Sequence, residues 1–281
     1  MNSEKCIWLF TAALTAAVIS EAKVVLSDDF STYSAGKPIG NGNWKPKWVS
    51  EISSQQGLFT AHEDGYAVLS GSAERAYHIP YQTGFIIRPG QSVTLSADFR
   101  YTYVGGGAID EYRNSKVFGL QLSTAPNWYN GKRTDLCLSN RGEAMGFVLP
   151  SDPWVEGWIP HKTLGIDLNK ETTGEWLHFE CNVYDRDGEL AATMTVSAEG
   201  FPAYTTKEFP LGLPVGSVVY PGFTTGWSSA KSCIREYARI AEVHMDNFSV
   251  QTDSAALQLV KAPPPKVKPA RPQVSTLGLV L

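Results

Sequence analysis

The chain lacks several features that would narrow its function at once. After residue 22 it has no apolar run long enough to span a membrane, and it has neither a phosphate-binding glycine loop nor a nucleophile elbow. Basic residues are not in excess, because 24 Lys and Arg face 28 Asp and Glu, a formal net charge of −4. Since binding to a phosphate backbone needs a basic surface, we expect no nucleic-acid partner.

Cysteine is also scarce, with 4 in 281 residues. Cys6 lies within residues 1–22, which we interpret below as a signal peptide. The remaining cysteines are Cys137, Cys181 and Cys233. In an oxidising compartment, three thiols allow one disulfide and one free cysteine, and their spacing fits no zinc-binding pattern. Buried, unreactive cysteines are the alternative interpretation.

The two ends of the chain differ in composition from the middle. A basic residue precedes an apolar stretch over residues 7–19 that is too short to span a bilayer comfortably, and small residues follow it. We interpret residues 1–22 as a signal peptide, with a retained membrane anchor as the alternative. Residues 253–281 are rich in Pro and Lys, which predicts a disordered, extended tail. We therefore expect a secreted, periplasmic or cell-surface protein with one folded domain over residues 23–252.

Helical periodicity is nearly absent, whereas strand patterns are frequent. Residues 92–104 alternate apolar and polar side chains over a dozen positions, which predicts a half-buried strand, and residues 116–123 continue the pattern. Residues 177–183 and 190–196 predict a hairpin, because the Asp187-Gly188 pair between them suits a tight turn with positive φ. Short strands separated by Gly, Pro and Asn turns predict an antiparallel two-sheet sandwich.

The last predicted strand, Glu242–Gln251, contains an irregularity. Its apolar positions occupy one face as far as Met245 and the other face from Phe248 onwards. Since side chains alternate strictly along a regular strand, the change of face at Asp246–Asn247 predicts a β-bulge.

The order of motifs along the chain supports a family resemblance. The sequence SDDFSTYSAGKPIGNGNW comes first, then the long alternating strand, the hairpin WLHFECNVYDRDGELAATMTV, the segment YPGFTTG and the closing VHMDNFSV. This order resembles exported concanavalin A-like (LamG-like) jelly-roll domains of bacterial extracellular proteins. The resemblance covers nearly all of residues 23–251 and implies an all-β jelly-roll sandwich with adjacent first and last strands. Such domains include carbohydrate-binding modules, glycoside hydrolases and polysaccharide lyases, so the fold does not choose between these functions.

The implied pairing of the terminal strands would bring Asp28 and Asp29 near Asp246. Converging carboxylates repel one another unless a cation or backbone amides neutralise them. Calcium accepts oxygen ligands in loose geometry, so we predict a structural Ca²⁺ bound by Asp28, Asp29 and Asp246. The alternative is that these side chains cap turns without any metal.

Two segments combine aromatic and polar residues as a sugar site requires, because sugars present flat apolar faces edged by hydroxyls. We interpret residues 125–135 and 149–162 as loops that carry this site. The predicted ligand-binding residues are Trp128, Tyr129, Arg133, Asp135, Trp154, Glu156, Trp158 and His161. The resemblance marks Trp44 and Trp176 as framework residues instead.

No catalytic signature is recognisable. The Glu-x-Asp-x-x-Glu pattern of laminarinase-like jelly rolls is absent, and so are the strand motifs of alginate lyases. Elimination would need two groups, a base and a residue that neutralises the substrate carboxylate. The candidates for these roles on plausible strands are Arg100, Tyr101, Gln121, His178 and Tyr184. The leading hypothesis is an exported module that binds extracellular polysaccharide. The alternatives are a polysaccharide lyase or glycoside hydrolase, and a surface structural or adhesion protein.

Overall fold

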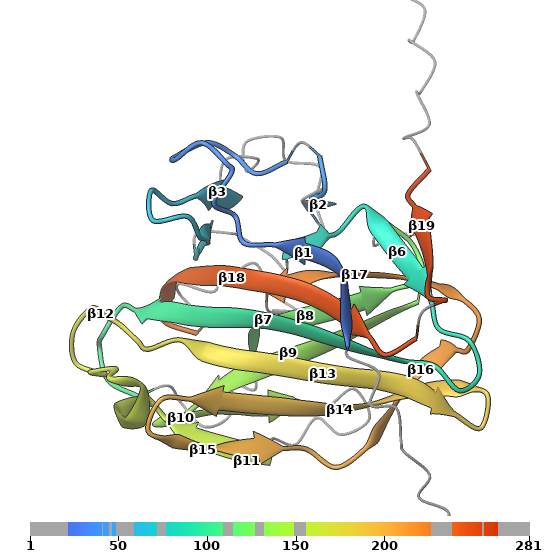
Figure 1. Ribbon diagram of the computed structural model, residues 1–281. Helices are drawn as coiled ribbons and strands as arrows, with labels where there is room; N and C mark the ends of the chain where they lie inside the picture. Colours follow the sequence, from blue (N-terminus) through green and yellow to red (C-terminus); the bar gives the residue numbers. More distant parts are fainter. Residues whose placement is uncertain are drawn as a thin grey trace, which may run out of the picture.

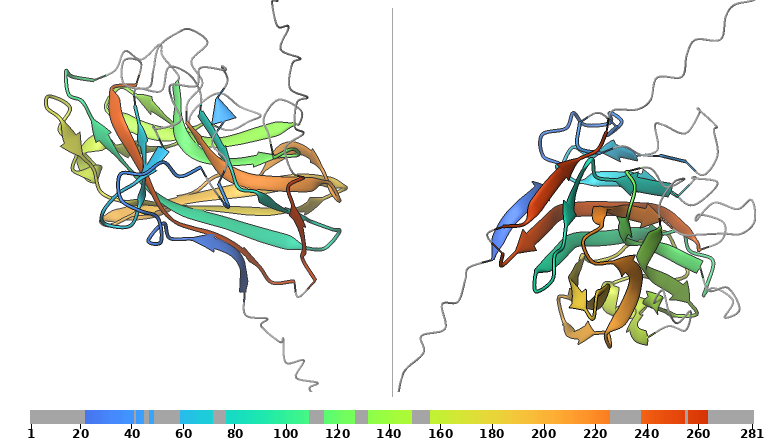
Figure 2. Two further views of the ribbon diagram at one scale, coloured as in Figure 1. Left: turned by 90° about the horizontal axis from the view of Figure 1, so that it is seen from above. Right: turned by 90° about the vertical axis from the view of Figure 1, so that its right-hand side faces the viewer.

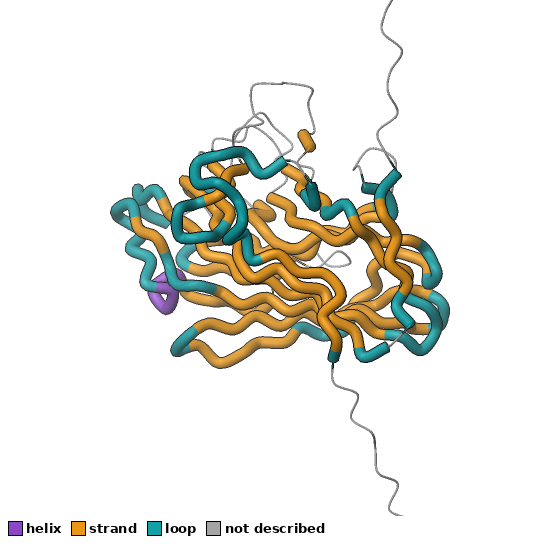
Figure 3. Tube along the Cα trace, turned by 45° about the horizontal axis from the view of Figure 1, so that its top comes forward, coloured by secondary structure: helices purple, strands orange, loops and turns teal. Residues whose placement is uncertain are grey.

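The computed structural model describes residues 22–40, 42–44, 47–48, 59–71, 77–108, 115–126, 132–148, 156–225, 238–254 and 256–263. Within these ranges the chain forms two antiparallel sheets that stack on each other (Figure 1, Figure 2). Strands dominate the trace, and the helical turn in Figure 3 is the 3-10 helix η2 (His161–Leu164). The predicted jelly-roll β-sandwich is confirmed.

One sheet contains ten strands among the described residues, and we refer to it as the ten-stranded sheet. Its strands are β1 (Lys23–Asp28), β3 (Phe59–Ala61), β4 (Ala67–Ser70), β7 (Ser92–Tyr103), β12 (Thr172–Thr173), β13 (Leu177–Arg186), β14 (Glu189–Ala198), β15 (Phe201–Thr205), β16 (Phe209–Pro214) and β18 (Ile240–Thr252). The main path runs β15-β14-β13-β7-β18-β4-β3, with β1, β12 and β16 paired beside it. Strands β18, β7, β13 and β14 form the front layer in Figure 1.

The second sheet contains nine strands among the described residues and is called the nine-stranded sheet. Its strands are β2 (Lys47–Trp48), β5 (Tyr77–Pro80), β6 (Thr83–Ile86), β8 (Ser115–Ser123), β9 (Arg133–Arg141), β10 (Ala144–Val148), β11 (Glu156–Pro160), β17 (Val218–Thr225) and β19 (Gln258–Lys261). The main path runs β11-β10-β9-β8-β17-β5-β2, and β6 joins β17 to β19.

The hydrophobic core lies between the two sheets and is built from the alternation seen in the sequence. Every second side chain of β7, from Val93 to Tyr103, is fully buried. Phe99 at its centre packs against Phe118 of β8 and Phe223 of β17, with ring centroids 5.3 and 5.5 Å apart. Since burying one such ring contributes roughly 1.5–3 kcal/mol, this aromatic contact between layers helps to hold the sheets together.

The predicted hairpin is confirmed as β13 and β14. Leu177 pairs with Ala198 and the register continues without a break to the Arg186–Glu189 pair. The turn residues Asp187 and Gly188 have φ values of 54° and 90°. Positive φ at both central residues matches the right-handed twist of the flanking strands, which is why an Asp-Gly pair is favoured there.

The terminal strands of the domain lie side by side, as the resemblance implied. β1 pairs with β18, and Asp28 is opposite Phe248. The register of β18 against β7 shifts between Asp246 and Ser249, and Asn247 has a φ of 48°. The bulge predicted from the change of face is therefore confirmed.

The folded part extends beyond residue 252, so the predicted start of the tail is wrong. Strand β19 pairs with β6, and the amide of Ala262 donates to the carbonyl of Gln82 at 2.7 Å. Backbone pairing, and not side-chain burial, holds this strand, since Leu259 is 45% exposed.

The remaining terminal segments and cysteines give less information. Residues 1–21 and 264–281 lie outside the described residues. Among those described, no helix is long and apolar enough to cross a membrane. Cys181 is a free thiol buried on β13, and burial raises its pKa, whereas Cys233 lies outside the described ranges.

Candidate functional site on the outer face of the nine-stranded sheet

The face of the nine-stranded sheet that points away from the core carries polar side chains. Leu120, Leu136 and Phe223 point into the core, so their neighbours in sequence point to the opposite face. The cluster on that face consists of His78 on β5, Gln121 on β8, Arg133 and Asp135 on β9, and Thr224 on β17, and we call it the outer-face cluster. These residues are far apart in sequence, and only the strand order brings them together.

The register explains how these side chains meet. Gln121 pairs with Asp135 across β8 and β9, and Thr224 pairs with His78 across β17 and β5. Gly222 lies opposite Gln121 on β17, and a Cβ there would come within 2.4 Å of the Ile79 carbonyl oxygen. The absence of a side chain at Gly222 therefore allows the backbone of β5 to lie close to β17 beside Gln121.

A chain of hydrogen bonds runs through the cluster. Arg133 Nη1 lies 2.7 Å from His78 Nε2, and His78 Nδ1 lies 2.7 Å from Gln121 Oε1. Thr224 Oγ1 is 3.2 Å from the same Nδ1. Arg133 also donates from Nη2 to Asp135 Oδ2 at 3.1 Å.

The chemistry of arginine fixes the direction of every bond in this chain. A guanidinium can only donate, so His78 Nε2 must accept and must carry no proton. His78 Nδ1 then carries the proton and donates to Gln121 Oε1. The Gln121 amide is therefore oriented with its NH₂ group away from His78, and no other orientation satisfies all three residues.

Two polar atoms of the cluster remain without a hydrogen-bond partner within the described part of the chain. Gln121 is fully buried and its Nε2 has no partner. Asp135 Oδ1 lies 2.9 Å from Arg133 Nε, but it accepts no well-directed hydrogen bond. Leaving a buried polar group unpaired costs about 1–3 kcal/mol, so such atoms call for a partner from outside the chain.

The electrostatics agree with the hydrogen-bond directions. Burial, together with the charge of Arg133, lowers the pKa of His78 to about 4, although Asp135 and Gln121 raise it. His78 is thus neutral near pH 7, as an acceptor of the Arg133 proton must be. Tyr220 lies on the same face, because it pairs with Ser123, which pairs with Arg133. Burial raises the pKa of Tyr220, so this phenol keeps its proton.

Three of the predicted ligand-binding residues have described side chains on this face. Arg133 and Asp135 belong to the outer-face cluster, with side chains 16% and 9% exposed. Trp158 is 39% exposed on β11, next to Ile159, which faces the core opposite Met145. Trp158 therefore points outward at the edge of the same sheet. Its segment was interpreted as a loop, which is wrong for β11 and η2.

The other predicted ligand-binding residues lie elsewhere or outside the described residues. His161 is 1% exposed; it receives the Tyr101 hydroxyl at Nδ1 (2.6 Å) and faces Asn140 Oδ1 through Nε2 (2.8 Å). It stabilises the end of the core. Glu156 begins β11, but its side chain is not among those described. Trp128, Tyr129 and Trp154 fall outside the described residues, and their ligand-binding role stays a prediction.

The prediction of ligand-binding residues missed His78 and Thr224 altogether, and it considered Gln121 only for elimination chemistry. The available signal was a polar residue at alternate positions of apolar strands, as in Leu120-Gln121-Leu122. That pattern places a side chain on the outer face but does not say which strand lies beside it.

Asp28 and Asp29, two of the three predicted calcium residues, line a hollow of about 500 Å³ between β1, the following turn and β18, whereas Asp246 does not line it. Asp28 accepts hydrogen bonds from the Phe30 amide, the Tyr33 hydroxyl and Trp44 Nε1, at 2.7–2.9 Å. The side chain of Asp29 accepts from Ser31. Hydrogen bonds of this kind are those expected from the alternative interpretation, in which these side chains cap turns without any metal.

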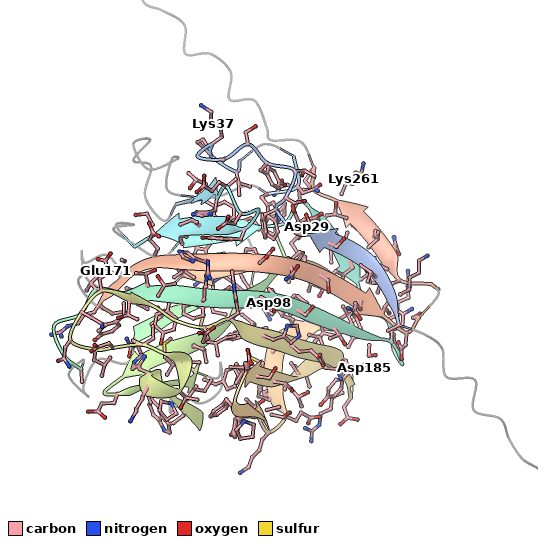
Figure 4. The ribbon with its side chains drawn as sticks, turned by 60° about the vertical axis from the view of Figure 1, so that its left-hand side comes forward. Asp29, Lys37, Asp98, Glu171, Asp185 and Lys261 are labelled. Carbon is pink, nitrogen blue, oxygen red and sulfur yellow. The ribbon has the colours of Figure 1, made fainter. Side chains whose placement is uncertain are left out.

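Asp246 and Asp98 lie near one another on the other side of the bulge. Figure 4 labels Asp29 beyond the end of β1 and Asp98 on β7. Burial raises the pKa of Asp246, while hydrogen bonds from His178 and Asn247 outweigh burial and lower the pKa of Asp98. Within the described ranges, no group of three or more His, Cys, Asp or Glu side chains is arranged to hold a metal ion. Calcium binding at this edge stays a prediction.

Comparison with known proteins gives no family for this chain. No family model matches the chain, and no curated protein matches it. It is similar to a PL-14 alginate lyase from Aplysia kurodai, with 14% identity over 82% of this chain and 99% of that one and a TM-score of 0.46. It is also similar to an endo-1,3-beta-glucanase from Streptomyces sioyaensis, with 13% identity over 83% and 97% and a TM-score of 0.48. A seed lectin from Lotus tetragonolobus matches with 11% identity over 85% and 100% and a TM-score of 0.44. Likeness at this level concerns the arrangement of strands and says nothing about what this chain binds.

Proposed function

We propose that this protein binds a polysaccharide on the outer face of its nine-stranded sheet. The observation that supports this most is the Gln121 amide, fully buried and held in one orientation by His78, with an NH₂ group that has no partner within the described ranges. A sugar oxygen would satisfy it. Sugar sites combine such fixed polar groups with apolar stacking surfaces.

Trp158 would supply the stacking surface. It faces outward from β11, two strands away from β9 in the sheet order, which corresponds to roughly 10 Å at the usual strand spacing. A saccharide chain that crosses the strands would meet the Trp158 ring at the sheet edge and the outer-face cluster further in. Lys132 is exposed and the Arg133 side chain is 16% exposed. A saccharide would therefore reach the cluster from the end of the sheet where β8 ends and β9 begins.

Affinity electrophoresis in gels that contain a panel of polysaccharides tests this function. We expect retardation of the wild type in at least one gel and weaker retardation of Gln121→Met and Trp158→Ala. Glu180→Gln, on the exposed face of β13 in the other sheet, is the matched control and should migrate like the wild type. An unretarded wild type across neutral and acidic polysaccharides would refute the proposal.

Elimination on an acidic polysaccharide is a second candidate, favoured by the presence of Tyr220 and His78 beside Gln121 and Arg133 on one face. Gln121 and Arg133 would bind the sugar carboxylate, which acidifies the neighbouring C–H. A base takes that proton, the glycosidic C–O bond on the next carbon breaks, and a C=C bond forms. Both ring nitrogens of His78 are committed to Arg133 and Gln121, so His78 would orient these two groups, and protonated Tyr220 can supply a proton to the leaving oxygen. Unsaturated products absorb in the ultraviolet, and their absence with every uronate polymer would exclude this candidate.

Hydrolysis receives less support from the same geometry. It usually requires two carboxyl groups that flank the glycosidic bond. Within the described part of the outer-face cluster, Asp135 is the carboxylate, and Arg133 holds it in an ion pair.

A further inference from the structure

We infer that the outer-face cluster takes a neutral, hydroxyl-rich saccharide and excludes uronate polymers; this inference rests on the proposed binding function. Two properties of the cluster identify the chemical class of the ligand. They are the hydrogen-bonding atoms that the cluster leaves unpaired and the net charge of its side chains.

The unpaired atoms are one donor and one acceptor. Gln121 presents NH₂ hydrogens because its oxygen is committed to His78. Asp135, opposite Gln121 in the register, has Oδ1 in an ion-pair contact with Arg133 Nε at 2.9 Å that lacks hydrogen-bond geometry, so this oxygen keeps acceptor capacity and can only accept. A hydroxyl group both donates and accepts, so neighbouring hydroxyls of one sugar can satisfy both atoms. A carboxylate only accepts, so it would satisfy Gln121 and leave Asp135 unpaired, and the pair therefore favours the hydroxyls of a sugar over a carboxylate.

The charges of the cluster lead to the same class of ligand. The Arg133 guanidinium is compensated by Asp135, whose two oxygens lie within 3.1 Å of its nitrogens. His78 is neutral because its Nε2 accepts from Arg133. An incoming carboxylate would therefore meet no net positive charge and would lie against the Asp135 carboxylate, and like charges repel strongly where solvent is scarce.

The other described side chains on this face do not change the balance. Ser123, Thr224 and Tyr220 are uncharged, and burial keeps the Tyr220 phenol protonated. Lys132 precedes β9 and is exposed, so water and salt screen its charge. The described side chains of this face therefore favour hydrogen bonds with hydroxyl groups over contacts with charged groups.

The test is affinity electrophoresis of the purified protein against neutral polymers (laminarin, xylan and mannan) and acidic polymers (alginate and polygalacturonate). Each gel is run at low and at high salt. The inference predicts retardation by a neutral polymer that is independent of salt, and no retardation by the acidic ones. Gln121→Met, which keeps the side-chain volume but removes the NH₂ donor together with the oxygen that accepts from His78, should weaken neutral binding about tenfold.

Asp135→Asn should reverse the selectivity. It replaces one of the two acceptor oxygens with an NH₂ donor and leaves Arg133 without its counter-charge, so neutral binding should weaken and a salt-sensitive retardation by the acidic polymers should appear. Glu180→Gln removes one carboxylate from the exposed face of β13, and it should change neither the retardation by neutral polymers nor that by acidic polymers. If Asp135→Asn fails to fold, the wild-type selectivity and its salt dependence still decide the question.

The possible outcomes separate the inference from the function on which it rests. Salt-sensitive retardation of the wild type by acidic polymers alone would overturn the inference and leave polysaccharide binding intact. No retardation by any polymer would overturn the binding function and the inference together.

Discussion

Replacement of Asp28 by asparagine tests how the two ends of the domain are held together. Asp28 ends β1, and its carboxylate accepts from the Phe30 amide through Oδ1 and from Tyr33 and Trp44 through Oδ2. Trp44 is fully buried and stacks on Phe223 of the nine-stranded sheet, with ring centroids 4.8 Å apart. One carboxylate therefore joins the first strand, the following turn and the aromatic core.

The loss of unfolding free energy in Asp28→Asn follows from the number of acceptor oxygens at this position. An asparagine has one oxygen, so its NH₂ group must face either the Phe30 amide or the Tyr33 and Trp44 donors, and at least one donor is left unpaired. The remaining bonds also lose the strengthening that a charged acceptor gives. With about 1–3 kcal/mol for the unpaired donor and about 1 kcal/mol for the lost charge, Asp28→Asn should lower the free energy of unfolding by about 3 kcal/mol. For a domain of this size, that corresponds to a fall in melting temperature of about 6–12 °C.

Urea unfolding followed by tryptophan fluorescence measures this change, with the slope of the transition as a check on two-state behaviour. Asp29→Asn is the control, because Asp29 is exposed and its side chain accepts hydrogen bonds from the neighbouring Ser31, and we expect little change. If Asp28→Asn unfolded at the same urea concentration as Asp29→Asn, the carboxylate would not have the anchoring role described above.

Other predictions concern pH and metal. Burial lowers the pKa of His78 and His161 to about 4, against 6.5 for an unperturbed histidine. The unfolded chain therefore takes up protons between pH 6.5 and 4 while the folded chain does not, so stability should fall as the pH drops through this window; an unfolding midpoint in urea that stays flat would contradict it. His178 behaves in the opposite way, because the hydrogen bond to Asp98 raises its pKa, so its contribution is complete below pH 6.5 and is lost as the pH rises above it. The effect should be small, since His178 is half exposed, and His178→Gln should abolish it in the same titration. If the predicted calcium site exists, chelation should lower the melting temperature and added Ca²⁺ should restore it, whereas an unchanged melt would remove the site.

The sequence predicted the parts of the fold that depend on burial. The alternation in residues 92–104 identifies β7, because each inward side chain is fully buried, whereas the polar ones between them are partly exposed except for Ser96 and Thr102. The change of face at Asp246–Asn247 identifies the bulge for the same reason, since the side chains on both sides of it are buried. Strand β19 was missed because its pairing with β6 uses backbone groups and leaves its side chains exposed.

The candidate site was predictable only in part. Arg133 and Asp135 were found because they follow an aromatic and polar segment, and both join the outer-face cluster. His78 lies 43 residues before Gln121 on a strand of four residues, with nothing local to mark it. Its role depends on β17 lying between β5 and β8, so that side chains from three strands meet on one face. The order of strands in a sheet is a property of the whole chain, which local patterns do not contain.

The most direct test of the central claim is an NMR titration that follows the side-chain NH₂ signals of Gln121 as oligosaccharides of the bound polymer are added. Saccharide binding on the outer face of the nine-stranded sheet predicts that these signals shift strongly and saturably, together with the indole signal of Trp158. Shifts confined to residues around Asp29 and Asn247, with the Gln121 signals unchanged, would place the ligand elsewhere and contradict the account.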